Sequence, residues 1–90
     1  LQLPDEYEIA EIKAPKKIAN STLASLQLNK KYQLTLITLK RVFEVKKDGE
    51  LLEEEHIIGV TNAETIVYDT DTLVVFGSLK NIQKFIEINE

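Results

Sequence analysis

The residues from Leu73 to Ile88 include the first candidate for chemistry. They read as a strand, a turn at Gly77-Ser78 and a helix, an order that in many proteins places a phosphate at a helix N-terminus. A phosphate-binding loop needs several glycines followed by Lys and Ser or Thr. This stretch has one glycine, with Lys80 three residues later. We therefore expect Gly77 to permit a sharp turn and Ser78 to cap the helix.

Two carboxylate-rich stretches are the other candidates. Glu53 and His56 have the spacing of a helical metal-ligand pair, but a di-iron site needs two such pairs and the chain has one histidine. We expect a solvated acidic arm that ends at His56. Asp69 and Asp71 would point the same way on a strand, yet no nucleophile or base accompanies them, so an Asx-type turn is expected. No motif of a known catalytic site occurs, and the chain is not expected to be an enzyme.

Composition indicates one folded domain. The chain has 90 residues, 43% of them hydrophobic and 29% charged, with a net charge of −4. This acidic balance argues against nucleic-acid binding. The absence of cysteine excludes disulfides and thiolate chemistry. No apolar run approaches the ~20 residues of a membrane span, so no direct membrane insertion is expected. Because the sequence begins at Leu1 rather than Met, we expect it to be part of a longer protein.

The first half of the chain is expected to form a strand, a helix and a second strand. Tyr7–Ala14 is the first strand, and residues 19–32 form a helix of about three turns capped by Thr22 or Ser21. Residues 34–41 alternate as an inner strand with both faces largely covered, Leu34 and Leu36 on one face and Ile37 and Leu39 on the other.

The second half begins with the strongest hairpin signal, Asp48-Gly49, which suits a type I′ turn. Gly59 marks a bulge. Short strands over 64–68 and 72–77 and a closing helix over 79–88 follow. The fold class is therefore α+β: a small, mainly antiparallel or mixed sheet with two helices and an extra β-hairpin.

Four short motifs follow one another along almost the whole chain. They are Thr22-Leu23-x-x-Leu26, Lys31-Tyr32, Leu39-Lys40-Arg41 and Asp71-x-Leu73-Val74-Val75-Phe76-Gly77. Their order and spacing resemble the RCK_C (TrkA-C) regulatory domain of Ktr/Trk-type potassium-uptake proteins. Asn20 replaces a family glycine before the first helix, and asparagine tolerates the left-handed conformation. The hairpin at residues 42–60 looks like an insertion.

The resemblance implies an organisation and a set of partners. Residues 1–90 would be a single RCK_C-like regulatory domain, and residues 1–6 the end of a linker from an upstream nucleotide-binding RCK_N domain. The domain would be a homodimer on the cytoplasmic side of a membrane subunit that transports potassium. It would carry no resident cofactor.

The resemblance also implies a ligand site, because some members of the family bind cyclic di-AMP at their dimer interface. The corresponding positions here are Leu23, Asn29, Lys31, Thr35, Leu36 and His56. Asn29 and Thr35 stand where the family has an Arg and an Asn, and Lys30 or Lys31 would replace the arginine only as a point charge. We therefore expect cyclic di-AMP to bind weakly or not at all.

Three alternatives remain open at this point. The same module could belong to another transporter, such as a cation/proton antiporter or an anion symporter. It could be a pure dimerisation domain without a ligand. A small-molecule-binding enzyme subunit of ferredoxin-like shape is disfavoured because catalytic residues are lacking.

Overall fold

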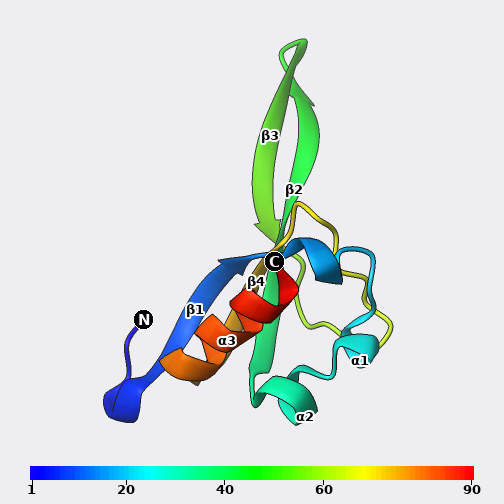
Figure 1. Ribbon diagram of the computed structural model, residues 1–90. Helices are drawn as coiled ribbons and strands as arrows, with labels where there is room; N and C mark the ends of the chain where they lie inside the picture. Colours follow the sequence, from blue (N-terminus) through cyan, green and yellow to red (C-terminus); the bar gives the residue numbers. More distant parts are fainter.

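The computed structural model describes residues 1–90 as a four-stranded antiparallel sheet with helices packed on one side (Figure 1). The strand order is β1-β4-β2-β3. The strands are β1 (Tyr7–Lys13), β2 (Thr35–Lys47), β3 (Glu50–Ile57) and β4 (Thr72–Ser78). The helices are α1 (Leu23–Leu26), α2 (Leu28–Tyr32), α3 (Leu79–Asn89) and the 3-10 turns η1 (Pro4–Glu6) and η2 (Lys16–Ile18). The expected α+β class is confirmed.

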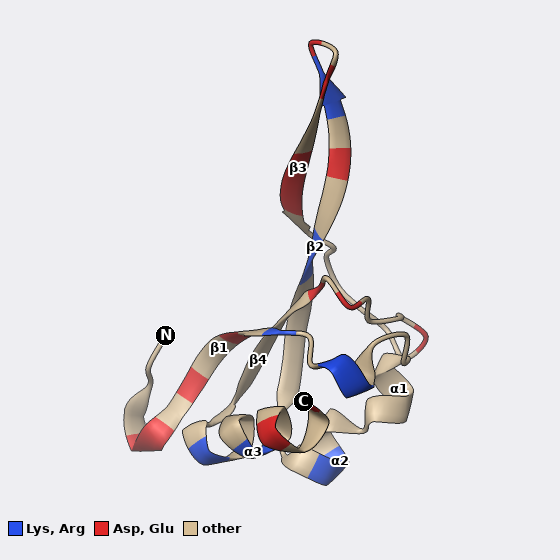
Figure 2. Ribbon diagram, turned by 45° about the horizontal axis from the view of Figure 1, so that its top comes forward, with Lys and Arg blue, Asp and Glu red and all other residues tan.

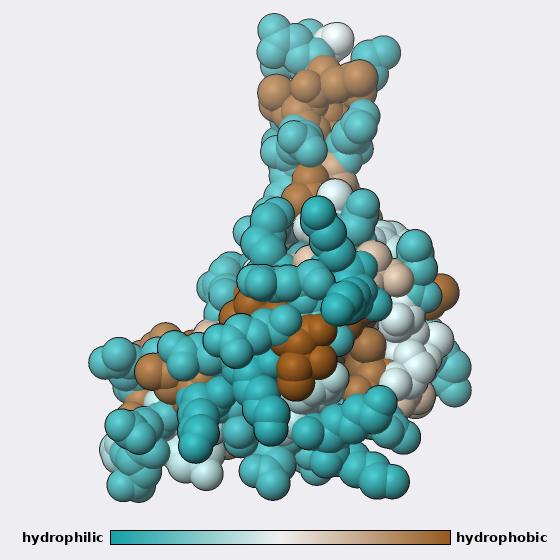
Figure 3. Space-filling model, in the orientation of Figure 1, coloured by the Kyte–Doolittle hydropathy of each residue, from teal (hydrophilic) through white to brown (hydrophobic).

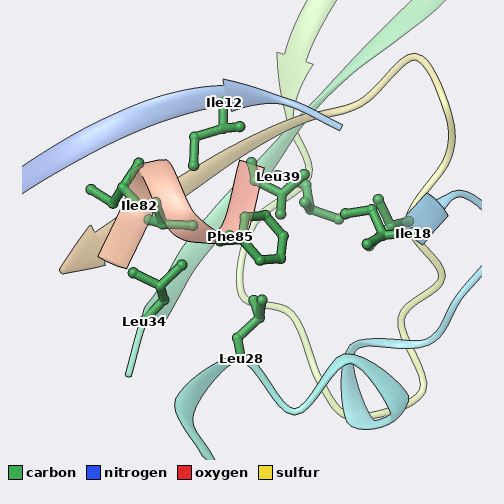
Figure 4. Packing of buried hydrophobic residues seen from close by; sticks show 10 residues of the cluster. Ile12, Ile18, Leu28, Leu34, Leu39, Ile82 and Phe85 are labelled. Carbon is green, nitrogen blue, oxygen red and sulfur yellow. The ribbon is translucent and has the colours of Figure 1, made fainter. Parts of the chain in front are cut away.

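The core lies between the sheet and α3. Ile82 and Phe85 of α3 are buried, and Figure 4 shows the Phe85 ring between residues from the sheet, η2 and α2. The Tyr32 and Phe85 rings pack in a T-shaped arrangement, with ring centroids 5.0 Å apart. The buried hydrophobic cluster comprises Ile12, Ile18, Leu28, Leu34, Leu39, Val67, Leu73, Val75, Ile82 and Phe85.

A bulge in β2 corrects the expected pattern of its side chains. Leu36 pairs with Val75 and Leu39 pairs with Leu73, with a register shift between Leu36 and Thr38. Because one extra residue is inserted, the alternation changes sides, and Leu39 joins Leu36 on the core face. The expectation that Leu39 shares a face with Ile37 was therefore wrong.

The opposite face of the sheet is less covered than we expected. Ile37 and Phe76 remain partly exposed, and the Phe76 ring stacks on Tyr7 with centroids 5.4 Å apart. Figure 2 shows α3 on one side of β1 and β4, with no helix over the other side. The prediction that both faces of the inner strand are largely covered was wrong.

The β2–β3 hairpin extends away from the rest of the chain as an arm, which we define as residues 42–56 (Figure 1). Asp48 and Gly49 both have positive φ, 51° and 80°, as a type I′ turn requires. The predicted turn is therefore confirmed. The whole molecule measures 48 × 28 × 24 Å, and this elongation reflects the arm.

The expected first helix is divided into two short helices. Thr22 caps α1 by accepting a hydrogen bond from the Ser25 amide at 3.2 Å, as predicted. Gln27 then adopts the left-handed conformation, with φ 48°, and α2 starts in a new direction. A second left-handed residue, Gln33, ends α2. The prediction of a single three-turn helix was therefore wrong, because Gln27 interrupts it.

The segment between β3 and β4 holds little regular structure. The expected strand over residues 64–68 is wrong, since only Ile66 forms an isolated bridge, with Thr22. Gly59 has φ 90° and lies in this loop rather than in a bulge. Its carbonyl accepts a hydrogen bond of 2.6 Å from the Thr38 hydroxyl, which ties the loop to β2.

Gly77 and Ser78 form a helix entry rather than a phosphate cradle. Ser78 caps α3, accepting a hydrogen bond from the Asn81 amide at 3.1 Å, as predicted. Gly77 lies inside β4 without a positive φ, so its expected role in a sharp turn was wrong. A Cβ atom at this position would overlap the side chain of Leu34. The glycine is needed because Leu34 packs directly against the β4 backbone.

Candidate functional site

A surface pocket of about 420 Å³ lies where α1, α2 and the start of β2 meet. The two left-handed residues, Gln27 and Gln33, turn the chain twice within seven residues and so bring these three elements together. The lining residues are Leu23, Ala24, Gln27, Leu28, Asn29, Lys30, Leu34, Thr35 and Leu36. We call this hollow the α2 pocket.

Four of the six predicted site residues border the α2 pocket. They are Leu23, Asn29, Thr35 and Leu36. Lys31 does not line it, whereas its neighbour Lys30 does. The pocket therefore has one ammonium group in its lining, and it comes from Lys30 rather than from the predicted Lys31.

The sixth residue, His56, lies outside this group. It is on the arm, opposite Arg41 in the β2–β3 ladder. Its Nε2 atom is 3.0 Å from a carboxylate oxygen of Glu54, and its ring lies beside Phe43 with centroids 5.9 Å apart. Within one copy of the chain, His56 therefore does not complete the pocket.

The charge and polarity of the α2 pocket suit a ligand that combines an anionic group with an apolar part. Lys30 is the one charged residue in the lining, and no acidic residue occurs in α1 or α2. Amide and hydroxyl groups of Gln27, Asn29 and Thr35 can donate hydrogen bonds. The leucine side chains supply an apolar surface. The lining contains no nucleophile with an adjacent base.

A buried ion pair that sequence reasoning missed fastens the β3–β4 loop to β2. Arg41 Nε and Nη2 donate to the two carboxylate oxygens of Asp71 at 2.9 and 2.8 Å. Arg41 Nη2 also donates to the Ile66 carbonyl at 2.9 Å, and the guanidinium lies 3.8 Å from the centroid of the Tyr68 ring. The hydrogen bond to Asp71 raises the pKa of Arg41 above its ordinary value, although burial opposes this.

Asp71 also has the turn role that the sequence predicted, because the Tyr68 amide donates to its carboxylate at 2.8 Å. Its partner Arg41 lies 30 residues earlier in the chain. No local spacing connects the two residues, so only a fold-level alignment of β2 with the loop before β4 could have revealed the pair.

A second, larger hollow of about 590 Å³ lies beside the end of β1. Its lining residues are Glu11, Ile12, Lys13, Ala14, Pro15, Lys16, Ile86 and Glu90. We call it the β1–α3 groove. Neither hollow contains a group of three or more His, Asp or Glu side chains that could hold a metal ion. None of the helices has both the length and the apolar character needed to cross a membrane.

One curated relative matches nearly the whole chain. It is the Ktr system potassium uptake protein C of Bacillus subtilis (strain 168), which is 29% identical over 85 residues, or 94% of this chain. The chain spans about a third of that protein, because the match covers 33% of its length. No family model matches the chain.

Two solved structures have a similar fold. The RCK C domain of the potassium transport protein KtrA, in complex with cyclic di-AMP, has a TM-score of 0.68 and 25% identity, with 93% of this chain and 85% of that chain covered. The GsuK RCK domain has a TM-score of 0.61 and 16% identity, with 92% of this chain and 16% of that chain covered. The second likeness concerns the fold alone.

Proposed function

Because the chain is an RCK_C domain, we propose that it senses a small ligand and dimerises as the regulatory part of a potassium-transport protein. Most support comes from the α2 pocket. Four positions that the family resemblance associates with a ligand border this single hollow, although two left-handed turns separate them along the chain. The relatives are regulatory domains of potassium transport rather than enzymes, and the proposal assigns this chain no catalysis.

The pocket favours a ligand with a phosphate and an aromatic or other apolar part. Cyclic di-AMP belongs to this class, and it is bound in the similar RCK C domain of KtrA. Asn29 cannot make the bidentate, charge-assisted contact of an arginine, and hydrogen bonds to charged groups contribute about 1.5–3 kcal/mol. Lys30 lines the pocket and offers a point charge instead. We therefore expect cyclic di-AMP to bind weakly or not at all.

Isothermal titration with cyclic di-AMP tests this expectation. We expect a dissociation constant weaker than micromolar, and any measurable binding should be lost in Leu36→Asp, which places a negative charge in the pocket. Lys84→Ala is the matched control, because Lys84 is exposed on α3 outside the pocket. Micromolar or tighter binding would show instead that Lys30 replaces the arginine effectively. Binding that survives Leu36→Asp would place the ligand elsewhere.

The assembly belongs to the same proposal. The domain would form a homodimer, follow a nucleotide-binding RCK_N domain, and act on the cytoplasmic side of a membrane subunit that transports potassium. Residues 1–6 would end the linker between the two domains; here they fold back on β1, where Leu3 donates to the Tyr7 carbonyl at 2.8 Å. A chain that sediments only as a monomer at tens of micromolar would contradict the homodimer.

A dimerisation domain without a ligand is the second candidate, and Asn29 favours it because the arginine of the family is absent. A dimer that binds neither cyclic di-AMP nor related nucleotides would support it.

The same module could instead belong to another transporter, such as a cation/proton antiporter or an anion symporter. Transport measured with the full-length protein separates this candidate from a potassium-transport regulator. Leu36→Asp should change potassium uptake if the domain regulates potassium transport, and the transport of a different ion if it belongs to another transporter.

A further inference from the structure

The outer side of β3 has no partner strand. β3 is the last strand in the order β1-β4-β2-β3, so a row of its backbone N–H and C=O groups faces solvent. Its residues include no proline, and its pairing with β2 shows no register shift. Such an edge can accept an added strand from another polypeptide.

The arm also lacks support of its own. A two-stranded hairpin alone is marginally stable in water, and stability usually requires a third strand or a packed helix. Beyond Lys40, β2 pairs only with β3. The arm nevertheless carries large apolar side chains: Leu51 is 70% exposed, and Phe43 and Leu52 are 43% and 42% exposed. Figure 3 shows them as a hydrophobic band below the polar tip. An added strand would supply the missing support.

Like charges lie opposite each other in the arm. Residues 42–56 contain six acidic and two basic residues, and Figure 2 shows acidic residues on both strands. Glu44 is the direct partner of Glu53 in the ladder, and such a like-charge pair is destabilising. Glu55 lies on the same face as Glu53, because side chains two residues apart on a strand point the same way. We call these three carboxylates the acidic face, and none of them belongs to an ion pair of the chain.

Protection of the sheet edge does not explain this arrangement. Charged residues do guard edges against self-association, and lysine is used especially often. A lysine at either position of the Glu44–Glu53 pair would guard the edge and would also form a favourable cross-strand pair. Two carboxylates instead destabilise the free arm. They become favourable only when a cationic partner lies beside them.

Three lysines lie near the acidic face without neutralising it. Lys40 is paired with Glu11 at 2.7 Å. Lys13 lines a hollow at the base of the arm together with two of the three carboxylates, but it forms no ion pair there. Lys46 lies on the same face of β2, nearer the tip. These last two lysines leave the three carboxylates with a net negative charge.

The side chains of β3 on this face define the partner that would fit. They read apolar, acidic, acidic, apolar: Leu51, Glu53, Glu55 and Ile57. Ile57, like Leu51, is largely exposed, at 59%. An added strand gains affinity from main-chain hydrogen bonds and specificity from its alternate side chains. The complementary strand therefore carries two basic side chains between two apolar ones.

Cytoplasmic loops of membrane proteins have the required chemistry. They carry an excess of Lys and Arg over the loops on the other side of the membrane. Anionic lipid headgroups at the same surface would repel the acidic face. A second copy of the arm would place carboxylates against carboxylates. Charge complementarity therefore selects a basic loop of the membrane subunit over a lipid surface or another arm.

We propose that an extended basic segment in a cytoplasmic loop of the membrane subunit adds as a strand to the free edge of β3, with its basic side chains beside Glu53 and Glu55. This inference rests on the proposed regulatory function, and it names the element that meets the membrane subunit. The α2 pocket, with the ligand positions and the expected dimer interface, lies at the other end of β2 and stays free.

Photo-cross-linking in membranes tests the contact directly. A photoreactive amino acid replaces Leu51 in the full-length protein, which is expressed together with its membrane subunit. The linked peptide should come from a Lys/Arg-rich cytoplasmic loop, with a yield at least tenfold above that from Leu79, which is 41% exposed at the start of α3. Links only to a second copy of the chain, links only to lipid, or no link at all would overturn the proposal.

A charge reversal tests the role of the acidic face. Glu53→Arg with Glu55→Arg should weaken the affinity of the full-length protein for the purified membrane subunit at least tenfold. Glu64→Arg with Glu87→Arg changes the net charge equally at exposed positions outside the arm and should alter the affinity less than twofold. An equal loss in both variants would reduce the effect to net charge and would refute the assigned site.

A third variant separates binding from the stability of the arm. Glu53→Gln removes the like-charge pair with Glu44, so protection of the arm amides in the free full-length protein should rise about two- to fivefold. The affinity for the membrane subunit should nevertheless fall at least threefold. An affinity that rises together with arm protection would mean that the carboxylate has no cationic partner, and would contradict the proposal.

The cross-link also separates this inference from the proposed function. Potassium uptake that depends on the domain, without a link from Leu51, would overturn the arm contact alone. A link to a basic cytoplasmic loop of a transporter for a different ion would support the arm contact and contradict the assignment to potassium transport.

Discussion

Replacing Asp71 by alanine should destabilise the protein far more than the loss of a turn cap would. The carboxylate is fully buried, and it accepts two hydrogen bonds from Arg41 and one from the Tyr68 amide. Without it, the Arg41 side chain, which is only 15% exposed in the intact protein, would lose its counter-ion. Removing one partner of a buried pair costs about 3–5 kcal/mol.

We expect a value near the lower end of this range, about 3 kcal/mol. Arg41 would keep its hydrogen bond to the Ile66 carbonyl and its position over the Tyr68 ring. For a domain of this size, 1 kcal/mol corresponds to about 4–8 °C in Tm, so the midpoint should fall by about 12–24 °C. A simple turn cap would account for about 1 kcal/mol.

Urea unfolding followed by circular dichroism measures this difference, with the protein concentration held fixed because association shifts apparent stability. Asp69→Ala is the control, since this neighbouring carboxylate is exposed, and it should change stability by less than about 0.5 kcal/mol. The double variant Arg41→Met with Asp71→Leu should lose less stability than Asp71→Ala alone, because no uncompensated charge remains in the interior. A loss of about 1 kcal/mol or less for Asp71→Ala would refute the ion-pair argument and leave only the turn.

Three further outcomes follow from the fold. Gly77→Ala should cost about 1–3 kcal/mol in urea unfolding, because its Cβ overlaps Leu34; an unchanged midpoint would mean that Leu34 can move aside. Thr22→Ala should lower the free energy of unfolding in urea by about 1 kcal/mol, because it removes the capping oxygen. Thr22→Ser keeps this oxygen and should leave the free energy of unfolding nearly unchanged. The hydrogen bond to Lys47 lowers the pKa of Glu54, so its contribution to stability is present above the ordinary pKa of 4.5 and is lost as pH falls through the lower folded value. Protection of the arm amides, taken as the exchange rate relative to the intrinsic rate at the same pH, should therefore fall below about pH 4.5 before protection in the body does, and Glu54→Gln should remove this step.

Local signals were sufficient for several elements. The Asp48-Gly49 turn, the Ser78 cap and the closing helix each depend on residues within a few positions of one another. Asn20 has the left-handed conformation expected for it, with φ 67°. These features could be predicted because the physical cause lies inside the segment itself.

The remaining features depend on contacts between distant segments. Glutamine gives no local sign that Gln27 will interrupt a helix, and the bulge after Leu36 becomes visible only when β2 is aligned with β4. The α2 pocket could be anticipated only through the family resemblance, and even then Lys30 rather than Lys31 lines it. His56 lies on the arm, opposite Arg41, where the sequence predicted the end of an acidic arm, and its predicted part in a ligand site stays a prediction.

The continuity of β2 has a mechanical consequence. Its first residue, Thr35, borders the α2 pocket, and its last residue, Lys47, lies near the tip of the arm, so one strand of about 40 Å joins the two. The Arg41–Asp71 pair holds this strand to the β3–β4 loop at a point between its two ends. A displacement of one end of the strand would therefore pivot about this pair. A force that bends the arm sideways must either turn the pocket end of the strand or be absorbed at the bulge between Leu36 and Thr38.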